Sequence, residues 1–446
     1  MTRVSVIGAG YVGLVTGLCL ADLGIDVVCV DRDTKRIEDI GNGVLPIHEP
    51  GLAAILDRTL GGKFEATTNL AQAVADTDVT FIAVGTPLAD NGIDLTFVRE
   101  AAAEIGAALV QKSDYHVVAI KSTVVPGTTD RILIPELEAA SGKRAGASFG
   151  VAVNPEFLTE GTAVDEFMHP DRIVIGGLDE RSAATLVALH QAFESVDIQL
   201  TNPRTAEMIK YVSNALLATM ISFSNEIANL GAAIGGIDTV EVMRGVHTSR
   251  YFTSRGSSDK PVTAAIASFL EAGCGFGGSC LPKDAAALAA LSAKIGSPTP
   301  ILEAVIAVNR RQPEQLVELV VSELGDLAGR RVAVLGLSFK PGTGDVRESP
   351  AFPVIEGLQR HGALVVVHDP VVAPDDLPDR IRSSVEFQSE LETAVESVEA
   401  VVLVTRWDQY ADLPRVLGDR SPQPLLADGR RMVEKDSVTR YVGIGL

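Results

Sequence analysis

Val4-Ser5-Val6-Ile7, followed at once by Gly8-Ala9-Gly10-Tyr11-Val12-Gly13, is the stretch that decides the fold of this chain. The first four residues predict a buried strand, and the residues after the glycines predict a helix that runs through Leu23 and stops at Gly24. A second strand is predicted at 26–30, and it ends at Asp31, which stands 18 residues after Gly13. A glycine-rich turn between a strand and a helix, with an acidic residue at this distance, is typical of a domain that binds a dinucleotide.

Each part of this pattern has a physical role. The glycines let the backbone approach a pyrophosphate, which the positive end of the helix stabilises. Asp31 is expected to bind the adenosine ribose hydroxyls and to repel a 2′-phosphate, so the sequence favours NAD over NADP as cofactor. The alternative, a glycine-rich turn with no ligand, is the weaker interpretation once the strand, the helix and Asp31 are considered together.

Further strands follow at the spacing of an α/β domain, each with small or polar residues at its carboxyl end. They are 78–84 before Gly85-Thr86-Pro87, 116–121 before Ser122-Thr123, and 151–153 before Asn154-Pro155-Glu156-Phe157-Leu158-Thr159-Glu160-Gly161. Open parallel sheets bind ligands at that edge, so Thr86 and Thr123 are candidate cofactor contacts, although strand-end threonines often serve only as helix caps. Glu156 and Glu160 are expected at the same edge, with two solvated side chains as the alternative.

A second glycine-rich segment, Gly273-Cys274-Gly275-Phe276-Gly277-Gly278-Ser279-Cys280-Leu281-Pro282-Lys283-Asp284, presents a thiol. Its glycines are expected to let the backbone come close to a bound ligand. Pro282 and the helical run after it predict that Cys280 lies just before a helix N-terminus. That positive helix end and Lys283 both favour the thiolate, which makes Cys280 a candidate nucleophile; the alternative is a buried, inert cysteine.

Two long helical runs, 205–234 and 302–324, flank the cysteine segment. Lys210 and Asn214 are four residues apart in the first run, so they project from one face of it. The apolar neighbours of Lys210 indicate a partly buried ammonium, whereas a solvated lysine on an amphipathic helix is the alternative. Long helices between two α/β halves commonly form a connector and a subunit interface, and we therefore expect a homodimer.

Arg331-Val332-Ala333-Val334-Leu335-Gly336 opens a second α/β unit, in which strands at 363–367 and 400–404 follow in the order of the first. This half has no GxGxxG. Instead, Phe339-Lys340-Pro341-Gly342 and Asp345-Val346-Arg347-Glu348-Ser349 place cationic groups at a strand end, where they can hold a nucleotide phosphate; a plain structural duplicate is the alternative. The predicted fold class is α/β, with two Rossmann-like parallel-sheet domains joined by a central long-helix region. The expected domains are 1–200 for the dinucleotide, 201–325 for dimerisation and the catalytic cysteine, and 326–446 for the nucleotide sugar.

Length and composition narrow the class further. A chain of 446 residues is too long for one core and predicts several domains. Acidic residues outnumber basic ones 58 to 38, and the net charge of −20 would repel nucleic acid and anionic membranes, so neither is expected as a partner. Four cysteines with no CxxC pair predict neither a disulfide framework nor a metal site, and with no signal peptide or membrane-length apolar run they favour the reducing cytoplasm.

Taken together, these segments resemble the nucleotide-sugar dehydrogenases of the UDP-glucose 6-dehydrogenase and GDP-mannose dehydrogenase superfamily over nearly the whole chain. The motifs that carry the resemblance are GAGYVG at 8–13, VGTP at 84–87, KST at 121–123, NPEFLTEG at 154–161, EMIKYVSNA at 207–215, NE at 225–226, GFGGSCLPKD at 275–284, GLSFKPGT at 336–343 and RESP at 347–350. The resemblance implies that a sugar C6 alcohol is oxidised to a carboxylate with two NAD, through an aldehyde and a cysteine thioester.

The resemblance also implies roles for individual residues. Cys280 would attack the aldehyde while Lys210 and Asn214 stabilise the oxyanion; Thr123 and Asp284 would position a water or transfer a proton, and Glu156 or Glu160 would assist thioester hydrolysis. The positions that match cofactor contacts are Gly8, Gly10, Tyr11, Val12, Gly13, Asp31, Lys35, Gly85, Thr86, Thr123, Glu160, Lys283 and Arg347. The positions that match substrate contacts are Phe157, Leu158, Thr159, Glu160, Lys210, Asn214, Arg250, Phe269, Leu270, Glu271, Ala272, Gly273, Gly277, Lys340 and Arg430.

The chain departs from the family pattern in an insert at 251–268, where the family has only a few residues. We expect the insert to form a surface excursion with an exposed turn at 256–261 and a solvated Arg255, to return by a short helix at 263–269, and to leave the substrate contact to Arg250.

Two further departures bear on the substrate. Gly344 replaces a common acidic residue, and Leu281 follows the cysteine as in many GDP-mannose enzymes, where UDP-glucose enzymes more often have Phe. The leading hypothesis is oxidation of UDP-glucose to UDP-glucuronate. GDP-mannose or another nucleotide hexose is the alternative substrate, and a non-catalytic nucleotide-sugar-binding protein is the alternative of another class.

Overall fold

The structure is a computed structural model that describes residues 2–89, 92–193, 196–255, 261–418, 420 and 422–446. The chain divides into two compact units, Met1–Ser213 and Asn214–Leu446, each built around its own sheet. Helix α9 (Pro203–Ile234) belongs to both, because the division falls within it. Within the described ranges, no helix has the length and apolar character needed to cross a membrane.

The first unit contains an eight-stranded sheet in the order β10-β9-β8-β7-β4-β1-β2-β3. Its strands are β1 (Arg3–Ile7), β2 (Asp26–Val30), β3 (Phe64–Thr67), β4 (Val79–Ile82), β7 (Val117–Ile120), β8 (Gly150–Val153), β9 (Arg172–Gly177) and β10 (Asp197–Thr201). The inner strands are apolar and buried on both faces, as strands of a parallel sheet covered by helices on both sides must be. The strands predicted at 26–30, 78–84, 116–121 and 151–153 are confirmed.

One pairing in this sheet differs from the predicted parallel arrangement. Strand β9 runs antiparallel to β8, through Ala152 opposite Gly177 and Val153 opposite Gly176. The connection between them contains only the six-residue helix α7 (Ala163–Met168), which rises about 9 Å. Because so short a helix does not carry the chain back across the sheet, β9 starts at the edge where β8 ends.

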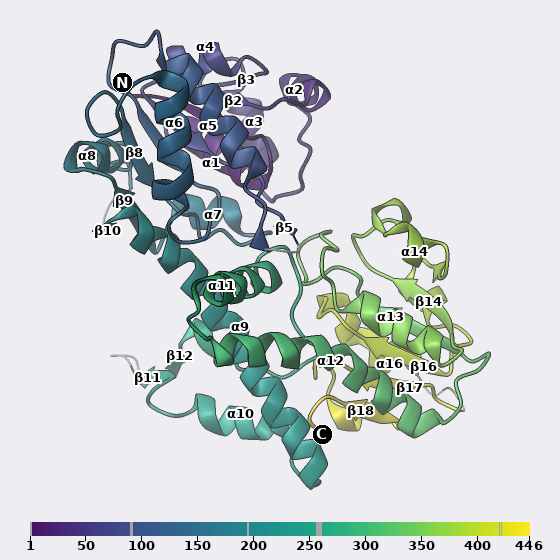
Figure 1. Ribbon diagram of the computed structural model, residues 1–446. Helices are drawn as coiled ribbons and strands as arrows, with labels where there is room; N and C mark the ends of the chain where they lie inside the picture. The colour runs from purple at the N-terminus through teal and green to yellow at the C-terminus, as the bar shows by residue number, and fades with distance from the viewer. Residues whose placement is uncertain (1, 90–91, 194–195, 256–260, 419, 421) are drawn as a thin grey trace. The chain divides into compact units, whose positions relative to one another are not determined.

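Helices cover both faces of the first sheet (Figure 1). Helices α1 (Tyr11–Asp22), α3 (Leu52–Thr59), α7 and α8 (Glu180–Leu189) share one core with the strands, and α4 (Leu70–Ala75), α5 (Thr96–Leu109) and α6 (Ile134–Ser141) share the other. Helix α2 (Thr34–Gly41) follows β2, a π-helical turn (Thr129–Leu133) precedes α6, and β5 (Leu88–Ala89) pairs with β6 (Gly92–Ile93).

The second unit repeats the strand order of the first. Its sheet runs β15-β14-β13-β16-β17-β18, which matches β3-β2-β1-β4-β7-β8. The strands are β13 (Arg331–Leu335), β14 (Leu364–His368), β15 (Glu386–Phe387), β16 (Ala400–Leu403), β17 (Leu425–Asp428) and β18 (Tyr441–Gly443), and every pair is parallel. Helices α12 (Pro300–Leu324) and α13 (Ala351–Arg360) share one core with this sheet, while α15 (Leu391–Ala394) and α16 (Leu413–Leu417) share the other. Helix α14 (Asp379–Arg382) precedes β15. The predicted duplication of the α/β unit is confirmed.

The insert forms a small hairpin. After α10 (Thr239–His247), strand β11 (Thr253–Arg255) pairs antiparallel with β12 (Pro261–Thr263). The return helix is a 3-10 turn, Ala265–Phe269, so the short helix predicted at 263–269 begins two residues late because Thr263 pairs with Thr253 in the hairpin. The predicted turn at 256–261 lies outside the described residues up to 260, and so does the side chain of Arg255.

Candidate active site

The turn between β1 and α1, residues 8–13, is called the dinucleotide turn below. Gly8 has a φ of +107°, and a Cβ at that position would lie 2.6 Å from the carbonyl oxygen of Ala83. A Cβ at Gly13 would lie 1.8 Å from the carbonyl oxygen of Gly8. These two glycines are therefore required by packing within the protein. Gly10 is different, because a Cβ there would meet nothing within 4 Å.

The dinucleotide turn fits a pyrophosphate. Gly10 is the N-cap of the twelve-residue helix α1 and provides no side-chain cap, so the first amides of the helix have no side-chain acceptor at this end. The open space beside Gly10 is where an anion can reach them. A dinucleotide held there would supply a hydride acceptor.

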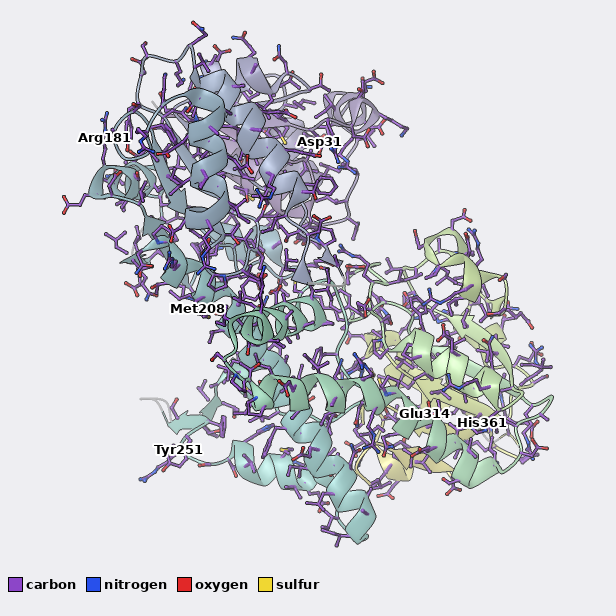
Figure 2. All side chains as sticks on the ribbon, viewed as in Figure 1. Asp31, Arg181, Met208, Tyr251, Glu314 and His361 are labelled. Carbon is purple, nitrogen blue, oxygen red and sulfur yellow. The ribbon has the colours of Figure 1, made fainter. Side chains whose placement is uncertain are left out.

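Asp31, labelled in Figure 2, lies at the carboxyl end of β2. Its carboxylate accepts a 2.8 Å hydrogen bond from the backbone N–H of Ala9. Its carboxylate is 3.2 Å from the Arg36 guanidinium. Lys35, in contrast, is exposed and pairs with Asp39 at 2.8 Å. The structure therefore brings Arg36, and not Lys35, to the predicted ribose-binding carboxylate. Arg36 follows Asp31 by five residues and lies in the first turn of helix α2. This short separation was the feature of the sequence that could have predicted the contact.

The ends of the neighbouring strands meet beside the dinucleotide turn. Gly85 and Thr86 follow β4, and Thr123 follows β7, which is the next strand in the sheet. The Thr86 hydroxyl donates a 2.8 Å hydrogen bond to the carbonyl of Thr123. Since β2, β1, β4 and β7 are parallel neighbours, these residues share one edge of the sheet with Asp31. The sheet order reverses between β1 and β4, which is where such sheets bind dinucleotides.

The segment 154–161, called the glutamate loop below, begins at the same edge. Glu156 is buried, and its carboxylate accepts a 2.7 Å hydrogen bond from the Leu158 N–H and lies 3.1 Å from the Lys210 ammonium. Lys210 is 4% exposed, and its ammonium is 5.5 Å from the centre of the Phe157 ring. The alternatives of a solvated lysine at 210 and a solvated glutamate at 156 are therefore wrong. Glu160 is half-buried at the end of the loop.

Lys121 is a buried cation that is not among the residues predicted from the sequence. Its ammonium donates to the side-chain oxygen of Asn154 at 3.0 Å and lies 5.4 Å from the centre of the Phe81 ring. Burial lowers the pKa of Lys121 to about 8, although the Glu156 carboxylate raises it. The signal available in the sequence was a lysine at the end of an apolar strand in the KST motif.

Cys280 is the N-cap of helix α11 (Leu281–Ile295), as predicted, and it is exposed. The other three cysteines are buried. Burial raises the pKa of Cys19 and of Cys29 to about 12 and also raises the pKa of Cys274. Because thiolates are the reactive form, those three thiols are inert at neutral pH and Cys280 is the available nucleophile.

A carboxylate lies one helical turn after the thiol. Asp284 is 1% exposed, and its backbone N–H donates to the carbonyl of Cys280 at 2.9 Å. Its carboxylate accepts a 2.6 Å hydrogen bond from the side-chain amide of Asn214 and one of 2.5 Å from the Lys283 ammonium. The structure thus brings together four predicted residues of the second unit, Asn214, Cys280, Lys283 and Asp284.

The glycines of the cysteine loop, residues 273–280, lie against neighbouring segments of the protein, and their approach to a bound ligand stays a prediction. A Cβ at Gly277 would lie 2.2 Å from the carbonyl oxygen of Glu348, and one at Gly278 would lie 2.7 Å from the Phe339 ring. At Gly273 the nearest atom would be the carbonyl oxygen of Gly429 at 2.9 Å. The close approach is therefore to neighbouring protein segments, because the loop packs against the two strand-end loops of the second sheet.

Polar side chains fix the conformation of this loop. Asn225 of α9 accepts from the Gly273 N–H at 2.8 Å, and Asn309 of α12 accepts from the Phe276 N–H at 2.8 Å. Arg430 donates to the carbonyl of Gly275 at 3.0 Å. The backbone around the thiol is held from three directions, so Cys280 is presented on a rigid support.

The remaining predicted residues of the second unit, other than Arg250, lie on loops that adjoin this support. Lys340 and Arg347 are in the long loop after β13, where Arg347 pairs with Asp345 at 2.6 Å. Glu271 pairs with Arg406 at 2.8 Å, and Phe269, Leu270 and Ala272 are partly or fully buried beside it in sequence. Arg250 is exposed after α10, with its guanidinium 5.8 Å from the centre of the Tyr251 ring.

The second sheet does not keep an open dinucleotide site. Gly336 has a φ of +91°, and Asp369 ends β14 as Asp31 ends β2. The Asp369 carboxylate accepts from the backbone N–H groups of Leu337 and Ser338 at 2.8 and 3.0 Å and from the Trp407 indole at 3.2 Å. Internal donors therefore occupy the position that a ribose would need. Among the residues that the structure describes, no group of three or more His, Cys, Asp or Glu is arranged to hold a metal ion.

Comparisons with known proteins show which family the chain resembles. Three family models match the chain: the NAD binding domain of the UDP-glucose/GDP-mannose dehydrogenase family over residues 2–194, its central domain over 204–311 and its UDP binding domain over 333–435.

Individual relatives cover nearly the whole chain. UDP-glucose 6-dehydrogenase AglM of Haloferax volcanii is 41% identical over 438 residues, which are 97% of each protein. A GDP-mannose 6-dehydrogenase of Pseudomonas savastanoi pv. phaseolicola is 36% identical over 97% of this chain and 95% of its own. The solved structure of a UDP-glucose dehydrogenase from the archaeon Pyrobaculum islandicum matches 100% of this chain and 98% of its own, with 38% identity and a TM-score of 0.89.

Proposed function

The chain belongs to the UDP-glucose/GDP-mannose dehydrogenase family, and from that membership we propose that it oxidises the C6 alcohol of UDP-glucose to the carboxylate of UDP-glucuronate. It is an NAD-dependent nucleotide-sugar dehydrogenase, as its motifs predicted. Bound NAD supplies the hydride acceptor. The chain's own residues orient the sugar, stabilise developing charge and carry the covalent intermediate.

One observation carries the proposal: the exposed Cys280 occupies the N-cap position of α11, one turn before a buried carboxylate, Asp284, that accepts a hydrogen bond from the amide of Asn214. The thiol adds to the C6 aldehyde, and loss of a hydride from the resulting thiohemiacetal gives a thioester. A water oxygen then bonds to the acyl carbon, the carbon–sulfur bond breaks, and the sulfur leaves as a thiolate. The positive end of α11 favours that thiolate in both directions.

Asn214 and Lys210 are proposed to stabilise the oxyanion on C6. Asn214 carries two amide hydrogens, and Asp284 takes one of them, which fixes the direction in which the other points. Lys210 is buried beside Glu156, so its ammonium is desolvated and acts strongly on nearby charge. For the first unit we propose that Glu156 or Glu160 assists thioester hydrolysis and that Thr123 orients the water.

UDP-glucose is the proposed substrate because relatives named for it match the chain at 41% identity over almost its full length. A GDP-mannose 6-dehydrogenase matches at 36%, and Leu281 directly after the cysteine favours that alternative. Lys340 and Arg430 are proposed to reach the nucleotide diphosphate in either case, because both are cationic and lie on strand-end loops of the second sheet.

A homodimer through α9 is also proposed. Six large apolar side chains of this helix are 40% to 64% exposed, and Met208 is labelled in Figure 2. They are Met208, Val212, Leu216, Phe223, Leu230 and Ile234. At 3.6 residues per turn they fall within an arc of about 80°, so they form one continuous stripe. Analytical ultracentrifugation of the wild type and of Phe223→Glu tests this: the variant should be a monomer.

We further propose that residues 1–200, 201–325 and 326–446 act as cofactor, dimerisation and nucleotide-sugar domains. A cytoplasmic location is proposed because all four cysteines are free and the nucleophile needs to stay reduced.

The deciding experiment is the yield of NADH per nucleotide sugar, measured over a panel that includes UDP-glucose and GDP-mannose. Two NADH and one uronic acid are expected per UDP-glucose. Cys280→Ser should bind NAD with unchanged affinity and form no acid, whereas Cys274→Ser should form acid at a rate close to that of the wild type. Acid formation by Cys280→Ser at the wild-type rate would refute the covalent mechanism, and a higher kcat/KM for GDP-mannose would move the substrate to the alternative.

A further inference from the structure

Glu49 is a buried carboxylate that contacts both the dinucleotide turn and the end of the glutamate loop. It is 5% exposed, in the connection between α2 and α3. One of its oxygens accepts hydrogen bonds from the Tyr11 hydroxyl and, at 2.7 Å, from the backbone N–H of Gly161. The other accepts from the N–H groups of Ala163 at 2.7 Å and Val164 at 3.4 Å. Four donors from two separate segments thus converge on a single side chain.

Helix capping accounts for only part of this arrangement. The bonds to Ala163 and Val164 satisfy the first amides of α7, a helix of six residues whose own N-cap, Thr162, provides no side-chain bond. The bonds from Tyr11 and Gly161 lie outside that helix and share one oxygen atom. Burial raises the pKa of Tyr11, and the hydrogen bond to Glu49 raises it further, so this hydroxyl stays a donor throughout the working pH range.

We propose that Glu49 is a positioning residue that holds the glutamate loop in register with the dinucleotide turn. Glu160 directly precedes Gly161, whose amide Glu49 binds, and Tyr11 belongs to the turn that receives the pyrophosphate. Charge-assisted hydrogen bonds are about twice as strong as neutral ones, which suits a contact that has to fix a loop. The carboxylate therefore sets the distance between the cofactor and the side chains that assist hydrolysis.

The other end of the loop is already fixed without Glu49. Asn154 is held by Lys121 at 3.0 Å and donates to the carbonyl of Val174 at 2.9 Å, and Glu156 is held by Lys210 at 3.1 Å. At the Glu160 end, Glu49 acts together with Glu166, which accepts from the Thr159 N–H at 2.6 Å. Loss of the Glu49 bonds would therefore loosen the Glu160 end and leave the other end fixed. Since a small displacement of a catalytic group costs a large factor in rate, the step that uses Glu160 should slow while the other steps continue.

This inference rests on the proposed function, in which the Cys280 thioester is hydrolysed by a water at the glutamate loop. The test uses the full-length chain with NAD and UDP-glucose, mixed rapidly and quenched with acid. NADH release in the first turnover reports the two oxidations, and the mass of the denatured protein reports the acyl group on Cys280. Glu49→Gln removes two acceptor positions with little change of volume, and Tyr11→Phe removes one bond while α7 stays capped. Asp179→Ala is the matched control, because Asp179 caps α8 by accepting from the Ser182 N–H at 2.7 Å.

Glu49→Gln is expected to keep the first-turnover NADH rate within about threefold of the wild type, to lower kcat at least tenfold and to accumulate acyl-enzyme. Tyr11→Phe should change the same two quantities in the same direction by a smaller factor. Asp179→Ala should lower the melting temperature and accumulate no acyl-enzyme. If Glu49→Gln and Tyr11→Phe behave like Asp179→Ala, Glu49 is only a cap and the inference fails. If wild-type protein forms no acid, the proposed function fails and the inference falls with it.

Discussion

The dependence of stability on pH should change when His116 is replaced by asparagine. His116 is buried at the amino end of β7, where its Nδ1–H donates to the carbonyl of Thr77 at 2.9 Å and its Nε2 accepts from the Thr80 hydroxyl at 2.7 Å. The carbonyl has no proton to give, so the ring is the neutral tautomer protonated at Nδ1. The active-site residues of the first unit lie at the opposite, carboxyl ends of the strands.

The magnitude follows from the titration of this ring. Burial and, to a smaller extent, the nearby Lys112 lower the pKa of His116 from 6.5 to about 4. As the pH falls below 6.5, His116 becomes protonated in the unfolded chain, whereas in the folded chain it stays neutral down to about pH 4. The stabilising contribution is therefore complete above pH 6.5 and is lost progressively toward pH 4. At pH 5 the loss is about 2 kcal/mol.

Hydrogen exchange of peptides that cover β7 measures the opening free energy of the first unit at pH 7.5 and pH 5. Between pH 7.5 and pH 5 the opening free energy of His116→Asn should fall by about 2 kcal/mol less than that of the wild type. At pH 7.5 the variant should be the less stable protein, because the substitution weakens buried hydrogen bonds. Its kcat at pH 7.5 should stay within twofold of the wild type. His361 is exposed and is labelled in Figure 2. The control variant His361→Asn should show the same fall in opening free energy between pH 7.5 and pH 5 as the wild type. Equal losses in His116→Asn and wild type would refute the reasoning.

Four further variants test ligand binding and the packing of the dinucleotide turn. Asp31→Ala should narrow the ratio of kcat/KM for NAD over NADP at least tenfold, because it removes the charge that repels a 2′-phosphate; an unchanged ratio would contradict the assignment. Gly10→Ala should raise KM for NAD without lowering the melting temperature, since a Cβ there meets no protein atom within 4 Å. Gly13→Ala should lower the melting temperature, since its Cβ would lie 1.8 Å from a carbonyl oxygen. Arg250→Ala should raise KM for the nucleotide sugar about tenfold and leave KM for NAD unchanged; if Arg255→Ala does so instead, the assignment across the hairpin is shifted by five residues.

Much of the fold could be predicted from local patterns in the sequence. The alternation of apolar runs with glycines and polar residues located β1, α1, β2, β4 and β7 to within a few residues, because an element's type depends mainly on its own residues. The same patterns located Asp31 and Cys280 at the ends of their elements. Strand-end residues such as Thr86 and Thr123 could be grouped at one edge, because parallel strands all end on the same side of their sheet.

Contacts between distant segments could not be predicted in this way. The sequence alone left Lys210 between a buried and a solvated state, and its pairing with Glu156 decided the question. It also did not indicate that the turn of helix α2 brings Arg36 to Asp31, and the contact of Lys35 with the cofactor stays a prediction. The antiparallel pairing of β9 depended on the length of α7, which was not part of the strand pattern.

The clearest case is the pair of glycine-rich segments, which look alike as sequence. Both permit close backbone approach, and the sequence by itself determined that much. Tertiary structure decided what approaches: open space at Gly10 in the dinucleotide turn, but the Glu348 carbonyl and the Phe339 ring at Gly277 and Gly278. The physical reason is that the absence of a Cβ allows another group to come close to the backbone but does not determine whether that group is a ligand or another part of the protein. Only the packing of segments far apart in the chain leaves open space at one glycine turn and builds a rigid support for a thiol at the other.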